Sequence, residues 1–164
     1  MRNLRIEKVT LNMGCGVNTP IDQAKKIMEM ISERKIVVTK TRTRTTFNVP
    51  KNKPIGCKVT IRKDAEVFLK RMLEAKDNKL SERNFDSTGN FAFGVKEYID
   101  VPGAQYDPKL RMLGFDVCVT LERPGYRVKR KKLSRKLGKS HVIKKEDAVN
   151  FVKERFGVKM EEQQ

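Results

Sequence analysis

Hydrophobic and polar residues alternate along three stretches of the chain, and this period of two predicts half-buried β-strands. The stretches are residues 6–13, 55–62 and 115–121. In the first stretch, one face of the strand holds the apolar residues Val9, Leu11 and Met13. The other face holds the polar residues Thr10 and Asn12. Ile6 falls out of phase with this pattern, which predicts a β-bulge near the start of the strand.

Hydrophobic residues recur at helical spacing in three other stretches, which predicts amphipathic helices. These helices are expected over residues 20–33, 65–76 and about 146–156. Thr19 is expected to cap the first helix, with Pro20 in its first position. Asp64 is expected to cap the second helix, and Gly157 to end the last one. Residues 77–93 show no clear period.

A fourth strand is predicted over residues 36–47, but its composition is unusual. In TKTRTRTTF, residues 39–47, threonines alternate with basic residues, so one face is threonine and the other is cationic. Neither face is apolar. A short polar loop, VPKNKP at residues 49–54, separates this strand from the next one.

The order of these elements predicts an α+β fold: an open antiparallel sheet with helices packed on one face, and a basic C-terminal extension. We assign residues 1–121 to the α+β domain. Residues 122–164 form the basic extension plus a terminal helix packed on or near that domain. The uncovered face of the sheet would present Lys40, Arg42, Arg44, Lys58, Thr60 and Arg62. Cations on a flat sheet suit a phosphate backbone better than the edge of a base.

The charge of the chain makes a polyanion the expected partner. The 164 residues carry a formal net charge of +17, and the sequence pI is about 10.0. Residues 34–63 contain ten basic and no acidic side chains, residues 123–145 contain eleven and none, and the rest of the chain sums to −4. Two cationic segments on a slightly acidic body indicate nucleic-acid binding rather than a solvated surface.

Other features argue against a membrane, secreted or zinc-binding protein. Hydrophobic residues make up 38% of the chain, and no apolar run approaches the roughly 18 residues of a membrane span. The first residues lack the apolar stretch of a signal peptide. Three cysteines without a CxxC pair indicate reduced thiols in a cytoplasmic protein, not a disulfide framework or a zinc site.

Two alternatives to a specific RNA-binding protein are compatible with these features. One is a generic RNA chaperone or DNA-compacting protein. The other is an enzyme with a cryptic nucleophile at Cys15, although no second group at a known spacing supports it. The single histidine, His141, lies in a basic segment, where we expect solvation or phosphate contact rather than acid–base catalysis. The glycine spacing matches neither nucleotide-binding loop, so no cofactor is expected.

The aromatic residues and the basic extension carry two further predictions. Phe85, Phe91 and Phe93 are expected to pack in the core rather than to stack on bases, whereas Phe47 suits either role. Residues 123–145 lack apolar periodicity. We therefore expect this segment to be disordered or loosely held in the free protein and to be ordered by the RNA that it binds.

Five segments stand in a characteristic order and spacing over roughly residues 4–121. They are VTLNMGCG, IVVTKTRTRTTF, PIGCKVTIR, NFDSTGNFAFGVKE and LRMLGFDVCVTL. Together they resemble the large-subunit ribosomal protein L-five family, the protein that binds 5S rRNA in the central protuberance. The basic tail, RPGYRVKRKKLSRKLGKSHVIKKEDAVNFV, is similar to the archaeal and eukaryotic branch of that family.

The resemblance implies that 5S rRNA lies on the open sheet, with contacts from Asn12, Phe47 and Thr60. Arg34 stands where bacterial relatives carry a glutamine, so a contact there would differ in kind. Neighbouring large-subunit rRNA and other 5S-binding ribosomal proteins are implied as further partners. The implied location is the cytoplasmic ribosome, with no membrane partner.

The resemblance also implies two contacts outside the large subunit. The loop at residues 49–54 would reach P-site tRNA through Lys51, Asn52 and Lys53. A surface around Tyr106 to Arg111 would meet small-subunit ribosomal protein S-thirteen in an intersubunit bridge. The complete set of candidate rRNA-binding residues is Asn12, Arg34, Lys40, Arg42, Arg44, Phe47, Lys58, Thr60, Arg62, Arg127, Lys129, Arg130, Lys131, Lys132, Arg135 and Lys136.

Overall fold

The structure, a computed structural model, describes residues 1–16, 20–44 and 49–161 of the chain. Within these residues, the main sheet consists of β1 (Arg5–Gly14), β2 (Val37–Lys40), β3 (Pro54–Ile61), β5 (Phe91–Val95) and β6 (Phe115–Glu122). Their order is β2-β3-β1-β6-β5, and each strand is antiparallel to its neighbours. The predicted α+β class and the open antiparallel sheet are therefore confirmed.

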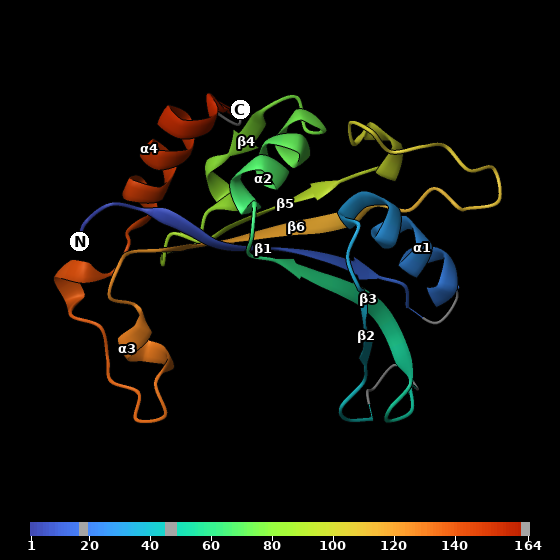
Figure 1. Ribbon diagram of the computed structural model, residues 1–164, viewed down its shortest axis with the longest axis horizontal. Coiled ribbons are helices and arrows are strands. Elements are labelled where there is room, and N and C mark those ends of the chain that lie inside the picture. The colour runs from blue at the N-terminus through green and yellow to red at the C-terminus, as the bar shows by residue number, and fades with distance from the viewer. Residues whose placement is uncertain (17–19, 45–48, 162–164) are drawn as a thin grey trace.

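The helices cover one face of this sheet. They are α1 (Ile21–Ser32), α2 (Ala65–Glu74) and α4 (Lys145–Phe156), with a short α3 (Arg127–Arg130) in the basic extension. Helix α1 packs on β3 and α2 packs on β1, and Figure 1 shows α2 and α4 above the sheet. Among the described residues, α3 is the only helix on the opposite side, at one end of the sheet, and it leaves most of that face open for a partner.

Several short elements surround this core. Strands β4 (Lys79–Ser81) and β7 (Lys159–Glu161) form a separate parallel pair, and single 3₁₀ turns lie at Glu82–Asn84, Tyr98–Asp100 and Lys139–His141. The sequence did not indicate β4 or β7, because three residues are too few to display a period. Strand β5 begins at Phe91, inside the stretch that shows no clear period.

Alternation within the strands explains which face is covered. Val9, Leu11 and Met13 of β1 are at most 1% exposed, and they pack in the same core as Ile27 of α1 and Leu69 of α2. The predicted bulge is confirmed, because the register of β1 against β6 shifts between Ile6 and Lys8. Phe85, Phe91 and Phe93 are also buried in this core, as expected.

The helix caps differ from the prediction. Thr19 lies outside the described residues, and Pro20 occupies the N-cap of α1 rather than its first helical position. Asp64 is the N-cap of α2, but it adopts a left-handed backbone (φ 57°) and its side chain accepts no capping hydrogen bond. Gly157 ends α4 in the left-handed conformation (φ 64°), as predicted.

The predicted cationic strand is wrong for residues 41–44, and its last residues, 45–47, lie outside the described residues. Strand β2 ends at Lys40. Thr41 still makes backbone hydrogen bonds to Asn52 and Lys53, and the chain then bends at Arg42 and Thr43. The buried Thr41 hydroxyl donates to the Pro50 carbonyl at 2.7 Å and accepts from the Lys53 amide at 3.1 Å. Threonine therefore closes a turn here instead of extending a strand, and Pro54 opposite Lys40 has no N–H to donate.

The C-terminal helix shares the core of the sheet. Ile143, Ala148 and Val152 are completely buried in the same hydrophobic cluster as the β-strands. Gly89 lies against the segment that leads into this helix, because a Cβ atom there would collide with the Ile143 side chain. Residues 123–144 thus leave the sheet after β6 and return to it before α4.

Candidate nucleic-acid interface

Antiparallel pairing brings polar residues into rows across the open face. Asn12 on β1 lies opposite Lys58 on β3 and opposite Asp116 on β6. The next row joins Thr60, Thr10 and Cys118 in the same way. Directly paired residues share a face of the sheet, so each row places its side chains side by side.

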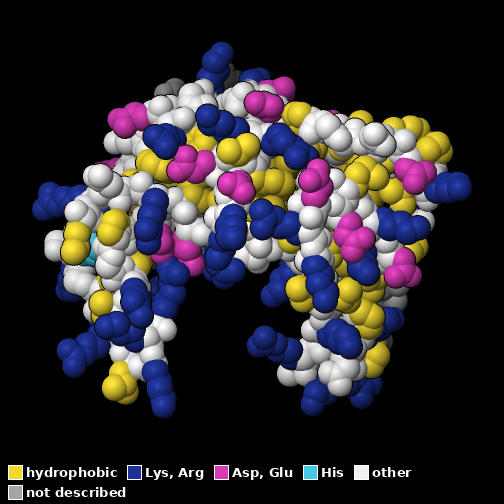
Figure 2. All heavy atoms as spheres, in the orientation of Figure 1, with side chains coloured by type: hydrophobic (Ala, Val, Ile, Leu, Met, Phe, Trp, Pro, Cys, Tyr) yellow, Lys and Arg dark blue, Asp and Glu magenta, His cyan; other side chains and the backbone are white. Residues whose placement is uncertain are grey.

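Two basic projections flank this face. We call residues 37–61 the hairpin arm and residues 123–144 the C-terminal arm. In Figure 1 both arms extend from the sheet on the side opposite α2 and α4. Figure 2 shows a hollow between them, with Lys and Arg side chains along both arms. The result is an arch whose roof is polar and whose two sides are cationic.

Backbone hydrogen bonds hold the hairpin arm as far as the turn at residues 50–53, which we call its tip. Beyond the β2–β3 ladder, the Thr41 amide donates to the Lys53 carbonyl at 2.9 Å, and the Asn52 amide donates to the Thr41 carbonyl at 3.0 Å. Asn52 adopts φ 64°, which turns the chain at the tip. Lys51 and Asn52 are exposed there, and Lys53 is half-buried.

Ion pairs hold the root of the C-terminal arm. Arg130 of α3 pairs with Glu122 at the end of β6 and, at 3.1 Å, with Glu7 of β1. Glu122 is only 6% exposed and also pairs with Arg5 at 2.6 Å. A buried carboxylate needs such partners, so Arg130 is used to fix the arm to the sheet.

His141 is part of this root and is not a free phosphate ligand. Its Nε2 lies 2.9 Å from the Pro124 carbonyl oxygen, and its ring meets that of Tyr126 edge-on at 5.6 Å between centroids. The Tyr126 hydroxyl donates to the His141 carbonyl at 3.2 Å and accepts from the Ile143 amide at 3.0 Å. The expectation of a solvated or phosphate-bound histidine is therefore wrong, because the side chain packs between the two ends of the arm.

The predicted rRNA-binding residues fall into distinct places. Asn12, Lys58 and Thr60 lie together on the open face. Lys40 ends β2, whereas Arg42 and Arg44 follow it in the hairpin arm, and Arg62 follows β3. All four of these cations are exposed. Among the predicted cations of the C-terminal arm, those that are exposed and lack an ion pair among the described residues are Arg127, Lys129, Lys131, Lys132, Arg135 and Lys136. Phe47 lies outside the described residues.

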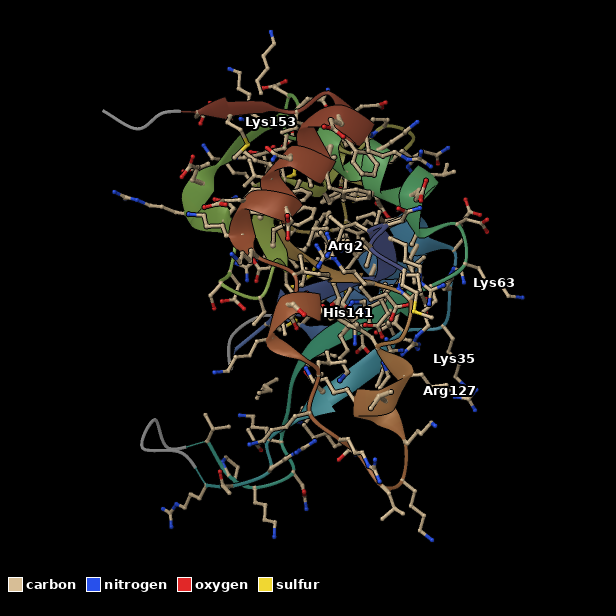
Figure 3. All side chains as sticks on the ribbon, turned by 90° about the vertical axis from the view of Figure 1, so that its left-hand side faces the viewer. Arg2, Lys35, Lys63, Arg127, His141 and Lys153 are labelled. Atoms are coloured by element: carbon tan, nitrogen blue, oxygen red, sulfur yellow. The ribbon has the colours of Figure 1, made fainter. Side chains whose placement is uncertain are left out.

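Arg34 is separate from the residues on the open face. It follows α1 and donates to the Lys63 carbonyl at 3.4 Å, beside a hollow that Val67 and Phe68 also line. This hollow is on the side of the sheet that the helices cover. Lys35, Lys63 and Arg127 point outward on one side of the molecule in Figure 3.

Two parts of the interface escaped the sequence analysis. Lys8 lies on the open face with Thr10 and Asn12, but neither Lys8 nor Thr10 was among the predicted binding residues, although the alternation along β1 already placed Thr10 beside Asn12. The ion pairs of Glu7 and Glu122 with Arg130 had no sequence signal, because they join residues more than a hundred positions apart or in separate elements.

The cysteines do not support an enzymatic site. Burial raises the pKa of the Cys15 thiol, and Cys15 is only 5% exposed. Burial also raises the pKa of Cys57. Partial burial and then the Asp116 carboxylate raise the pKa of Cys118 on the open face. A nucleophilic cysteine requires the opposite shift, so these thiols are unsuited to covalent catalysis.

The described part of the chain also contains no group of His, Cys, Asp and Glu side chains arranged to hold a metal ion. No helix within the described ranges is long and apolar enough to cross a membrane.

Fold and surface together define the class: an α+β protein that presents a basic, arched surface to a polyanion. Comparison with known proteins identifies the family. The model of the C-terminal part of the ribosomal L-five protein family matches residues 54–151. The chain is 44% identical to the large ribosomal subunit protein uL5 of Cenarchaeum symbiosum over 164 residues, which cover 98% of this chain and 97% of that protein.

Other relatives agree. The large ribosomal subunit protein uL5 of Nitrosopumilus maritimus is 43% identical over 162 residues, covering 96% of this chain and 94% of that protein. The protein of the same name from Methanococcoides burtonii is 41% identical over 165 residues, covering 98% of each chain. The chain therefore belongs to the ribosomal L-five protein family. It is a structural constituent of the large ribosomal subunit, associated with rRNA in the cytoplasm, and it is not an enzyme.

Proposed function

We propose that this protein binds 5S rRNA in the arch and contacts neighbouring large-subunit rRNA through the arms. The observation that carries the proposal is the polar row of Asn12 and Lys58 beside Thr60, set between two arms that contain no carboxylate in residues 34–63 and 123–145. A polyanion meets attraction on both sides of this arch and hydrogen-bonding groups at its roof.

The two parts of the surface have different tasks. Lysine and arginine contacts to phosphates supply most of the affinity and make it dependent on salt. They carry little information about sequence. Asn12 and Thr60 provide hydrogen bonds that recognise a base edge or a 2′-hydroxyl, and RNA-specific recognition depends on such contacts to unpaired nucleotides.

The tip of the hairpin arm is suited to a second RNA. We assign contact with P-site tRNA to Lys51, Asn52 and Lys53. Lys51 and Asn52 are exposed, and the hydrogen bonds at Thr41 fix the turn that carries them. A fixed tip loses little conformational entropy when it meets tRNA.

The loop before β6 is suited to a protein partner. Tyr106 is 61% exposed and Met112 is 50% exposed, with the exposed Arg111 between them. Aromatic residues, methionine and arginine are enriched at protein interfaces. This surface is our candidate for the intersubunit bridge to small-subunit protein S-thirteen, and neighbouring 5S-binding ribosomal proteins are further partners in the central protuberance.

A filter-binding titration tests the main proposal. Wild type is titrated against 5S rRNA and against an unrelated structured RNA of equal length, at two salt concentrations. We expect a clear preference for 5S rRNA that persists at the higher salt. Combined Asn12→Ala and Thr60→Ala changes should weaken 5S binding about thirtyfold, because two hydrogen bonds of about 1 kcal/mol each are lost. Binding to the unrelated RNA should barely change.

Matched variants separate specificity from charge. Lys58→Ala should weaken both RNAs and reduce the salt slope by about one. Lys153→Ala removes an exposed lysine from α4, at the far end of the molecule from the arms (Figure 3), and should change neither titration. If wild type binds both RNAs alike and salt weakens both equally, the protein is a generic polyanion binder and the proposal is wrong.

A further inference from the structure

The open face holds an acidic residue in the middle of a surface otherwise suited to phosphate. Asp116 is exposed on β6, directly opposite Asn12. Its side chain makes neither an ion pair nor a hydrogen bond within the described ranges. A carboxylate here repels phosphate, so RNA on this face must present a proton donor to it.

The surroundings of Asp116 leave room for a flat ligand. On the outer side it pairs with Gly94, where a Cβ atom would stand 3.7 Å from the Asp116 Oδ1. The adjacent row continues with Cys118 and Ala92, and Gly94, Cys118 and Ala92 are all small and exposed. The carboxylate therefore stands beside a low floor of short side chains.

The row that contains Asp116 runs from a cation through an amide to a carboxylate. Lys58, Asn12 and Asp116 occupy neighbouring strands, which lie about 4.8 Å apart. Lys58 suits a phosphate at one end of the row. The Asn12 amide donates two hydrogen bonds and accepts others, whereas an ionised aspartate only accepts.

This order of groups matches one base. Guanine alone presents two adjacent N–H donors, at N1 and N2, beside the acceptor O6. A carboxylate takes both donors with its two oxygens, and the Asn12 amide N–H₂ reaches O6. Adenine and cytosine each present a single amino donor, and uracil a single imino donor. In a duplex this edge of guanine is already paired, so the base must be unpaired.

We propose that Asp116, with Asn12, reads the Watson–Crick edge of an unpaired guanine in the RNA that lies on the open face. This inference rests on the proposed function, because it specifies what the roof of the arch recognises in 5S rRNA. Lys58 holds the adjoining phosphate, and the floor of Gly94 and Ala92 admits the ring.

The direction in which one substitution changes RNA affinity distinguishes recognition of guanine from simple charge repulsion. Removing a carboxylate from a surface that faces RNA should strengthen binding if the carboxylate only repels phosphates. Reading of guanine predicts the opposite: Asp116→Asn should weaken 5S rRNA binding about tenfold, since a good bidentate contact to a base is worth roughly that factor. Glu154→Gln on α4 removes one exposed negative charge far from the arch and should leave binding unchanged or slightly tighter.

Analogue interference identifies the base. 5S rRNA is transcribed with sparse replacement of guanosine by inosine, which lacks the N2 amino group, and bound molecules are separated from unbound ones. We expect inosine at an unpaired guanine to be excluded from the fraction bound by wild type. Asp116→Asn should abolish this exclusion, whereas Lys58→Ala should keep it while weakening all binding.

Three outcomes overturn the inference. The first is tighter binding of 5S rRNA by Asp116→Asn, and the second is the same pattern of inosine exclusion in wild type and in that variant. The third is that the variant loses binding only when Mg²⁺ is present, which would indicate a metal bridge between the carboxylate and a phosphate. In each case the preference of wild type for 5S rRNA over the unrelated RNA still decides the proposed function separately. Unchanged thermal unfolding of Asp116→Asn verifies that the variant is folded.

Discussion

The two cationic arms both lack acidic side chains but are built in different ways. The hairpin arm continues the main sheet, and backbone hydrogen bonds join Thr41 to Asn52 and Lys53 beyond the ladder. The C-terminal arm has no ladder. Across its middle, the Arg135 amide donates to the Val128 carbonyl at 3.2 Å, and most of its fixed contacts are at its root.

The two arms therefore share a cationic composition, but they differ in how much of their backbone is held by pairing within the described residues. In the hairpin arm, the described backbone at Thr41, Asn52 and Lys53 is held by hydrogen bonds. The exposed middle of the C-terminal arm, residues 131–136, gains its final shape at a higher cost in conformational entropy. The hairpin arm should therefore be most sensitive to substitutions that disturb its backbone, and the C-terminal arm to substitutions that remove side-chain contacts at its root.

The largest effect is expected from the backbone of the hairpin arm. Gly56 on β3 lies opposite Gly14, and a Cβ atom at Gly56 would stand 2.6 Å from the Met13 carbonyl oxygen. Gly56→Ala therefore forces two backbones apart. It should lower the free energy of unfolding by about 2–3 kcal/mol, as overpacking does elsewhere, measured by urea denaturation.

Gly14→Ala is the matched control, since a Cβ atom there has no neighbour within 4 Å. It should change stability by less than about 0.5 kcal/mol. Equal effects of the two substitutions would mean that the close approach of β1 and β3 does not constrain the hairpin arm.

Sequence reasoning located the sheet well where one face is buried. The ends of β1, β3 and β6 were predicted to within one residue, because burial of alternate side chains leaves a strong period. After Lys40, the alternation of threonine with cations did not indicate a strand with one buried face. Thr41 bonds its own turn, and no neighbouring strand holds Arg42 and Arg44 in a ladder.

The candidate site was only partly predictable for the same reason. Alternation placed Asn12 on one face of its strand, and Thr60 with Lys58 on one face of theirs. The register that sets Asn12 opposite both Lys58 and Asp116 depends on pairing between distant segments. Arg130 could not be distinguished from its basic neighbours, because the partners that occupy it lie on β1 and β6.

An intermediate effect is expected at the root of the C-terminal arm. Tyr126→Phe removes the hydroxyl that accepts from the buried Ile143 amide and donates to the His141 carbonyl. An unsatisfied buried amide costs about 1–2 kcal/mol, so urea denaturation should show a loss of that size. Trypsin should also cleave residues 127–136 faster than in wild type.

Tyr106→Phe provides the comparison, because Tyr106 is 61% exposed and lies outside both arms. We expect no measurable change in its stability or in trypsin cleavage of residues 127–136. If Tyr126→Phe left trypsin cleavage unaltered as well, the hydroxyl would not be what closes the two ends of the C-terminal arm.

The smallest effect is expected from ionic strength, and it should distinguish the arms without any substitution. The Debye length falls from about 10 Å at 0.1 M salt to about 3 Å at 1 M, so partly exposed ion pairs such as Arg130 with Glu7 weaken. A loss of about 0.5 kcal/mol corresponds to roughly twofold faster exchange of the Arg135 amide hydrogen.

The Asn52 amide in the hairpin arm is bonded to the Thr41 carbonyl and should exchange at the same rate at both salt concentrations. Glu7→Gln should remove the salt response at Arg135, since the pair that salt screens is then absent. Equal acceleration at Asn52 and Arg135 would show that the arms do not differ in how they are held.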